Sequence, residues 1–421
     1  MSEFNDEILV MVFAILLIPF FKPAGLDYYP LINTIFKGWK IASIAGIVLV
    51  LFFYGDNYHA QGSKLSKESL FSLLSLTTFE CIVLSDEILF GTSSVQDTMS
   101  LIVNPLLFYF LLRINLSSVK RPFYNALYYV FKVLLISQII SIVIVKSGHI
   151  IFQPQENDFT YLMGTDNYSA FAVLPMITSV LYLGMQKSGD NKLCTDDQLL
   201  LLALTIVYGY LKSATAFLSL LILSVLIILR RYKKKIIASF SVKRMIVCII
   251  IFLVLVLKFN VQNYFADFVS EIFNKKGNAS ITLNSRTYIW PLAMKLIKKQ
   301  FLFGYGTLSQ QTIKQYVLFG VDHAHNILLD LMLKAGIIGS VLFFVFVSIC
   351  FSRAKKNYDS GNSYILIFGL LSFLVLSVMD FYPLTTPQYV LYGLLYCCPD
   401  FLGIQKRRAP YDRSWLCRIK L

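Results

Sequence analysis

The chain has 421 residues, of which 57% are hydrophobic and only 15% are charged, and its mean hydropathy is +0.65. This composition is typical of polytopic membrane proteins and excludes an ordinary soluble domain. The net charge of +14 does not indicate a nucleic-acid partner, because the bases are scattered over short connections and do not line one surface.

Apolar segments follow one another along the whole chain, most of them long enough to cross a hydrocarbon core of roughly 30 Å. Lipid offers no partners for backbone hydrogen bonds, so these segments are predicted to be helices. Runs such as 217-FLSLLILSVLIIL-229 do not alternate as the strands of a barrel would. The sequence therefore predicts an all-α, polytopic integral membrane protein with about 12 transmembrane helices, at 8–21, 38–54, 69–90, 98–112, 123–145, 167–186, 197–211, 214–229, 245–258, 326–352, 363–381 and 387–403.

The positions of lysine and arginine predict the orientation of these segments. With a cytoplasmic N-terminus, 23 of the 38 bases fall on the cytoplasmic side, seven of them between Arg230 and Arg244. The opposite side holds 11, of which seven lie in the long connection 259–325, whose length exempts it from the rule. We therefore expect a membrane protein with both termini cytoplasmic and this loop outside.

Residues 1–421 are predicted to form a single membrane domain, in which 259–325 is the only connection long enough to fold by itself. Two stretches of this large extracytoplasmic loop, around 261–273 and 285–300, have the pattern of amphipathic helices, with aromatic and basic residues suited to the headgroup level. The simplest interpretation of Arg286 in the second stretch is that it snorkels to the interface or binds a lipid phosphate.

Two of the four histidines stand at the start of an apolar segment, in 322-DHAHNILLDLMLKAGIIG-339. On a helix continued back through both, His325 shares a face with the glycines of this segment and points into the bundle at its outer boundary. His323 would lie about 160° away around the axis, and Asn326 begins a separate polar stripe. A histidine that caps the helix is the alternative, but an ionisable group at this depth favours a functional role.

Three further polar residues on the predicted outer side are candidates for substrate binding. Asp166 and Asn167 begin a span, where capping of the helix is the simpler interpretation. Asp380 ends another span beside two aromatic residues, and either binds sugar hydroxyls or is a solvated interfacial acid. The histidine pair has metal-ligand chemistry, but we predict no metal and no other cofactor, because two ligands at i and i+2 are poorly placed on one helix face.

Several of these residues together resemble a known family. Arg286 with Trp290, the turn 303-FGYG-306, and 325-HN-326 before a helix with 335-AGIIG-339 are similar to the pattern shared by O-antigen ligases and O-antigen or capsular polysaccharide polymerases. Two earlier stretches are similar to other parts of that family, namely 164-GTDNYSAFAVLP-175 and 212-KSATAFLSLLIL-223.

One position departs from the family pattern. Where the ligases usually carry an arginine after the serine, this chain has Ser213 followed by Ala214. The difference leaves one phosphate-binding position unfilled unless Lys212 supplies the charge, and it argues against a ligase.

The resemblance implies an architecture like that of GT-C glycosyltransferases and transfer of glycan from a polyprenyl-diphosphate-linked donor to an acceptor hydroxyl. The leaving diphosphate needs fixed cations, and the hydroxyl needs a base. Arg286 suits the first role because its charged fork is bidentate, and His325 suits the second because imidazole is mostly neutral at pH 7. The candidates for substrate binding are Lys212, Asn326, Asp166, Asn167 and Asp380.

The leading hypothesis is a polysaccharide polymerase, which adds glycan to a lipid-linked repeat unit on the outer face during capsule or exopolysaccharide synthesis. A ligase that moves finished glycan to a lipid or protein acceptor is the alternative within the family. A flippase for lipid-linked oligosaccharide is an alternative of another class, which repeated halves would favour. The expected partners are an undecaprenyl-diphosphate-linked oligosaccharide, an acceptor glycan and membrane lipid, with a chain-length regulator and a flippase of the same pathway.

Overall fold

The computed structural model describes residues 2–27, 29–55, 65–90, 95–148, 160–188, 192–259, 279–306, 323–356, 363–380 and 385–408. Within these ranges the regular structure is helical, apart from an isolated bridge between Tyr161 and Gly164. The predicted all-α class is confirmed for this part of the chain. The helices are α1 (Ser2–Leu17), α2 (Pro30–Gly55), α3 (Lys67–Phe90), α4 (Val95–Asn115), α5 (Lys120–Lys146), α6 (Asp166–Ser188), α7 (Thr195–Tyr210), α8 (Ala214–Ile228), α9 (Lys233–Ser239), α10 (Val242–Phe259), α12 (Ala279–Lys299), α14 (Ile327–Lys356), α15 (Tyr364–Met379) and α16 (Thr386–Arg408), with 3-10 helices η1 (Ile18–Phe21), η2 (Ala24–Leu26) and η4 (Leu229–Tyr232).

Every predicted span contains a helix. Judged by length and composition, only some of these helices can cross a membrane. Among the described residues, five helices meet both criteria: Pro30–Phe53, Lys67–Ser85, Lys120–Lys146, Asp166–Ser188 and Ile327–Lys356. The pair α9 and α10, bent by 69°, gives a sixth if it forms one span. The chain is thus a membrane protein with several apolar helices, and the predicted number of about 12 spans is not confirmed.

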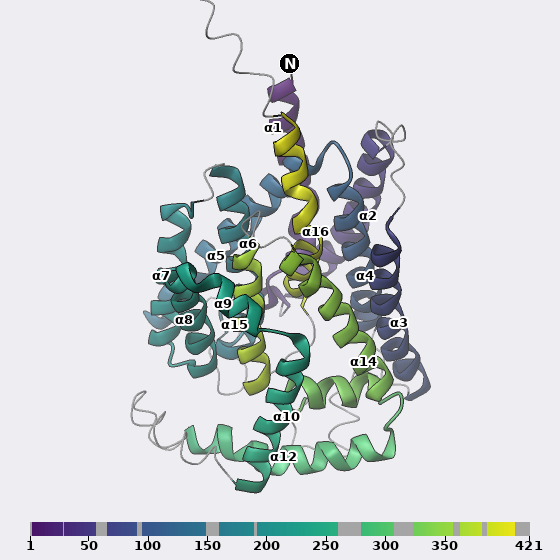
Figure 1. Ribbon diagram of the computed structural model, residues 1–421, viewed down its shortest axis with the longest axis vertical. Coiled ribbons are helices and arrows are strands. Elements are labelled where there is room, and N and C mark those ends of the chain that lie inside the picture. The colour runs from purple at the N-terminus through teal and green to yellow at the C-terminus, as the bar shows by residue number, and fades with distance from the viewer. Residues whose placement is uncertain are drawn as a thin grey trace, which may run out of the picture.

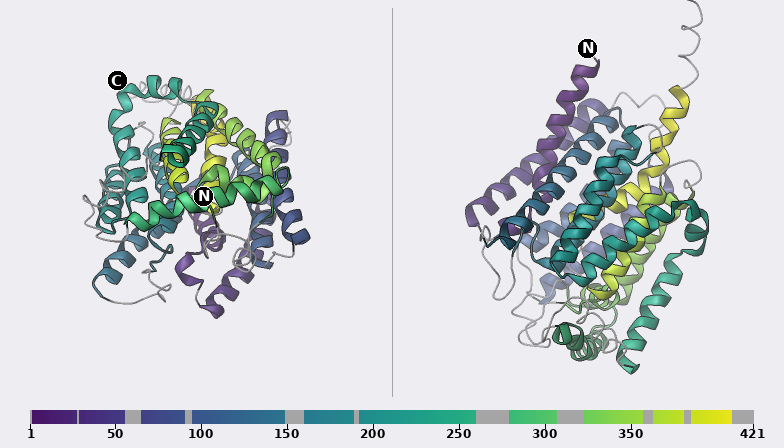
Figure 2. Two further views of the ribbon diagram at one scale, coloured as in Figure 1. Left: turned by 90° about the horizontal axis from the view of Figure 1, so that it is seen from below. Right: turned by 90° about the vertical axis from the view of Figure 1, so that its left-hand side faces the viewer.

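The helices form a bundle in which α16 contacts α4, α6 and α14. Three tyrosines of α16, Tyr389, Tyr392 and Tyr396, are almost completely buried in its core. Figures 1 and 2 show α12 lying across one end of the bundle, whereas the N-terminus and the last turns of α16 lie toward the other end. Of the two helices predicted in the long loop, α12 confirms the one around 285–300, and the one around 261–273 lies outside the described residues.

The helix α14 is broken at Gly336, where φ is 58° and ψ is −164°. Figure 1 shows the part before Gly336 lying across the end of the bundle and the part after it running along the bundle. The segment 301–306 fills the break with its backbone. The backbone hydrogen bonds across the break are Tyr305 N–H to Leu333 O (2.7 Å), Gly306 N–H to Lys334 O (2.9 Å), Ile337 N–H to Phe301 O (2.8 Å) and Ile338 N–H to Leu302 O (3.2 Å).

These bonds explain why a glycine-rich turn and a glycine-rich helix occur together in the sequence. Within a membrane, irregular backbone is tolerated only where protein supplies its hydrogen bonds. A Cβ on Gly336 would overlap the carbonyl group of Leu302, and one on Gly304 would lie 2.7 Å from the nitrogen of Ala335. The prediction that Gly336 packs against another helix is therefore wrong, because its neighbour is the backbone of the turn at Leu302 and Phe303; Gly339 does face α3.

Candidate active site

His325 lies before α14 rather than on it, contrary to the prediction that the helix continues through the histidines. The helix begins at Ile327, and His325 has a left-handed φ of 54°. Asn326 caps the helix, because its side-chain oxygen accepts hydrogen bonds from the N–H groups of Leu328 (3.0 Å) and Leu329 (3.4 Å). This cap fixes the helix start and turns the imidazole out of the helical path.

The short loop that carries the histidines is held from three sides. Asp330 accepts hydrogen bonds from the backbone N–H groups of Ala324 (2.6 Å) and Asn326 (3.0 Å). The side-chain amide of Asn326 donates to the carbonyl of Val378 at 3.1 Å, and the indole N–H of Trp290 donates to the carbonyl of Ala324 at 2.8 Å. The loop is therefore tied to α12, α14 and α15, which are distant in sequence.

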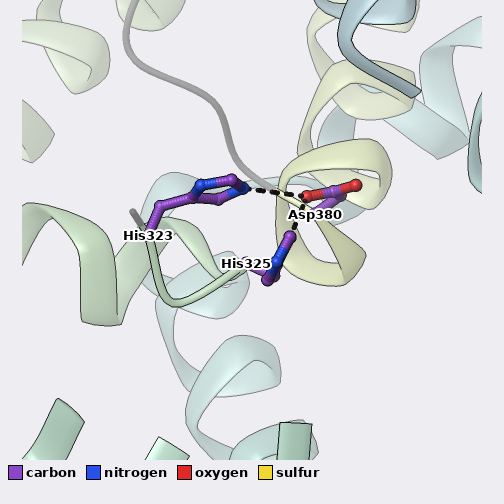
Figure 3. Close-up of side chains that lie close together, drawn as sticks. All are labelled: His323, His325 and Asp380. Carbon is purple, nitrogen blue, oxygen red and sulfur yellow. Dashed lines mark hydrogen bonds and ion pairs between the residues drawn. The ribbon is translucent and has the colours of Figure 1, made fainter. Parts of the chain in front are cut away.

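Asp380, at the end of α15, lies against both histidines, as Figure 3 shows. The Nδ1 atom of His325 is 2.7 Å from Oδ1 of Asp380, and Nε2 of His323 is 3.8 Å from the same oxygen. The two rings have centroids 4.0 Å apart. The expectation that His323 points away from His325 is wrong, because neither residue is helical.

The environment of the pair favours an ionised Asp380 and a neutral His325. Burial lowers the pKa of His325 below its usual value by more than the hydrogen bond and charge of Asp380 raise it. Burial by itself would raise the pKa of Asp380, but the hydrogen bond from His325, the nearby His323 and the charge of Arg286 bring it well below its usual range. A carboxylate only accepts, so Nδ1 of His325 carries the proton and Nε2 retains a lone pair.

Arg286 lies on α12, with 8% of its surface exposed, and its charge interacts with both His325 and Asp380. The structure thus brings together the arginine and the histidine that the sequence singled out, although 38 residues separate them. Trp290, one turn further along α12, is fully buried and holds the histidine loop through its indole. The charge of Arg286 therefore acts on the carboxylate–imidazole pair.

The candidates in 164–175 and 212–223 also meet. The side-chain oxygen of Asn167, in the first turn of α6, accepts hydrogen bonds from the hydroxyls of Ser213 (2.6 Å) and Thr215 (3.2 Å). Asn167 therefore links α6 to the start of α8 rather than capping its own helix, while Asp166 begins α6 with a partly buried side chain. Lys212, with φ of 58°, is exposed in the turn before α8.

His323, His325 and Asp380 also fit the residue types of a metal site, since their ligand atoms all lie within 4.8 Å of one another. The helical geometry that argued against a metal does not apply, because the two histidines precede α14. A tetrahedral zinc ion, however, separates its nitrogen and oxygen ligands by about 3.3 Å, and the 2.7 Å contact of His325 with Asp380 is a hydrogen bond. The positive charge of Arg286 further favours the hydrogen-bonded arrangement.

Comparison with known families agrees with this geometry. Residues 199–344 match a family model described as O-Antigen ligase. Over these residues the chain is similar to the O-antigen ligase family. It carries Lys212, Arg286, His325 and Asn326, whereas Asp166, Asn167 and Asp380 lie outside the match. No curated protein matches the chain.

This similarity to the O-antigen ligase family is consistent with a membrane glycosyltransferase-like enzyme. The pairing of Asp380 with His325 is what sequence reasoning did not find. Asp380 follows His325 by 55 residues. The one signal of its role in the sequence was its position as an acidic residue at the end of an apolar span.

Proposed function

We propose that this protein is a polysaccharide polymerase, which transfers glycan from a polyprenyl-diphosphate-linked donor to a hydroxyl of a lipid-linked repeat unit. The observation that carries the proposal is the hydrogen bond between Nδ1 of His325 and Asp380, on which the charge of Arg286 also acts. This arrangement offers a base and a cation at one place, which are the two groups that the reaction needs.

The reaction is a single displacement at the anomeric carbon. The acceptor hydroxyl loses its proton to Nε2 of His325 while its oxygen forms the new bond to that carbon. The bond from the carbon to the diphosphate oxygen breaks, and its electron pair leaves with the diphosphate, whose charge Arg286 stabilises. Asp380 stabilises the imidazolium that forms and keeps the ring oriented. Asn326, Asn167, Asp166 and Lys212 are proposed to bind substrate around this centre.

A ligase is the second candidate, because the matching family is described as O-Antigen ligase. The same residues would then transfer finished glycan to a different acceptor. The deciding experiment incubates purified protein with the lipid-linked repeat unit of its source organism. Products that lengthen one repeat unit at a time support a polymerase. Transfer only to another acceptor supports a ligase, and no transfer to any acceptor contradicts both.

Arg286→Lys should lower turnover by roughly 10- to 150-fold. Lysine keeps the charge but loses the bidentate fork, and one charge-assisted hydrogen bond made in the transition state is worth about 1.5 to 3 kcal/mol. We expect Lys212→Gln to have a smaller effect, because this residue is exposed. Turnover of the double variant equal to that of Arg286→Lys would indicate one diphosphate clamp. A wild-type rate for Arg286→Lys would contradict the role of the fork.

The site is proposed to face the outside of the cytoplasmic membrane, with both termini inside. The location of α12 at the end of the bundle opposite the N-terminus supports this orientation. A cysteine introduced at Lys298 in α12 should react with a membrane-impermeant thiol reagent in intact cells, and one at Lys234 in α9 should not. Equal labelling of both positions would contradict the topology.

A further inference from the structure

A second polar cluster lies between α2 and the turn that follows α1. Lys22 forms an ion pair with Asp27, and its ammonium donates to the side-chain oxygen of Asn33 at 2.6 Å. The Lys22 side chain is only 15% exposed. Lys40 lies two turns after Asn33 on α2, and it interacts electrostatically with both Lys22 and Asp27. Two ammonium groups therefore share a single carboxylate.

The face of α2 that carries this cluster is turned toward the protein. Asn33, Lys40 and Ile47 are spaced by seven residues and lie on one side of the helix, and Ile47 is 1% exposed. The opposite side faces outward, since Leu31 is 74% and Ile35 55% exposed. A lysine that only snorkels to the headgroups needs no such protein-facing position. Among the described residues, Lys40 thus adds a second positive charge to a cluster whose carboxylate is that of Asp27, and an anionic ligand would complete the cluster.

In the proposed topology, the connection that follows α1 and the candidate active site lie at the same outer end of the bundle. The 3-10 helix η1, directly before Lys22, contacts α16. The backbone N–H of Gly25 donates to the carbonyl of Leu162 at 2.8 Å, in the turn that leads into α6 and Asn167. Sugar units bound over this end could therefore extend from the cluster toward His325.

The proposed reaction requires a second diphosphate position, and this step rests on the proposed function. In a polymerase the acceptor hydroxyl lies on the repeat unit itself, so the acceptor's own diphosphate is separated from the reacting hydroxyl by sugar residues. Arg286 is beside the reacting atoms and is engaged by the diphosphate that leaves. The acceptor diphosphate must be held elsewhere on the same membrane face.

We propose that Lys22, Asn33 and Lys40 bind the diphosphate of the lipid-linked acceptor. The ammonium groups of the lysines and the amide of Asn33 donate hydrogen bonds to its oxygens. The polyprenyl tail lies in lipid along the exposed apolar side of α2. The site is thus specific for an acceptor that carries a diphosphate.

The test varies the acceptor while the lipid-linked donor is saturating. One labelled acceptor is the lipid-linked repeat unit, and the other is the same repeat unit as an alkyl glycoside without phosphate. Lys40→Gln should raise the KM of the first acceptor about tenfold, leave kcat unchanged, and leave the alkyl glycoside unaffected. Lys40→Arg, which keeps the charge, should restore most of the affinity, and Lys298→Gln on the exposed side of α12 serves as the matched control.

Three results would overturn the inference. An unchanged KM for the diphosphate acceptor would exclude the site. Equal losses with both acceptors would indicate a structural role for Lys40. The third result concerns binding of farnesyl diphosphate to the wild type in phosphatidylcholine nanodiscs. If added phosphatidylglycerol abolishes this binding, the cluster is a site for phospholipid headgroups. If the wild type uses neither acceptor, the proposed function itself has failed, which is distinguishable from all three.

Discussion

Replacement of His325 by alanine should reduce glycan transfer by about 10² to 10⁴-fold, the usual contribution of a general base, while the protein still inserts and folds. The reason is that Nε2 of His325 is the atom left to accept the proton once Nδ1 is bound to Asp380. The measurement is the single-turnover rate with lipid-linked substrate, together with the thermal unfolding temperature of the purified variant.

The left-handed φ of 54° at His325 calls for a second variant. Asparagine adopts this conformation more readily than alanine, so His325→Asn removes the base with less strain. Both variants should be equally inactive. His323→Ala should be milder, since its Nε2 is 3.8 Å from Asp380. Near-normal polymer formation by His325→Asn would rule out the base.

The pH dependence of the rate follows from the same pair. Burial keeps the pKa of His325 below its usual value, so kcat/KM should stay constant through neutral pH and fall only as acid protonates the imidazole. Asp380→Asn removes the hydrogen bond and charge that raise this pKa, so the acid limb should move to lower pH. Its plateau should also fall, by about 10² or more, because the ring is no longer oriented. If the acid limb of the Asp380→Asn profile moves to higher pH, the pairing of Asp380 with His325 is contradicted.

Gly336→Ala should destabilise the protein by about 2 to 6 kcal/mol, the largest effect that we expect away from the reacting groups. The φ and ψ values of Gly336 are almost inaccessible to other residues, which costs about 1 to 3 kcal/mol. The added Cβ also overlaps the carbonyl group of Leu302, and overpacking costs about 1 to 3 kcal/mol more. The measurement is thermal unfolding in detergent, with the yield of monodisperse protein.

Gly38→Ala is the matched control, since a Cβ at this helical position of α2 meets no atom within 4 Å. It should be neutral or slightly stabilising. Gly304→Ala should resemble Gly336→Ala, because it disrupts the same backbone insertion from the other side. The double variant should then be less destabilised than the sum of the two. Wild-type stability of Gly336→Ala would show that the break in α14 is not required.

Composition and hydropathy alone determined that the chain is helical and membrane-embedded, since in lipid the backbone can satisfy its hydrogen bonds only in a few ways. The amphipathic pattern of 285–300 likewise predicted α12. Arg286 and His325 were found from local motifs, because a buried or interfacial charge is costly and therefore conspicuous in an apolar sequence. These are properties of single segments, which periodicity and composition can report.

Tertiary structure alone decided how these segments meet. The sequence pattern continued α14 through His325, but the side-chain cap of Asn326 and the backbone of 301–306 shape that helix. The partnership of Asp380 with His325 joins the ends of two different helices, so no periodicity within either one reports it. Hydrogen bonds between distant segments depend on the positions of whole helices, which packing settles only after each helix has formed.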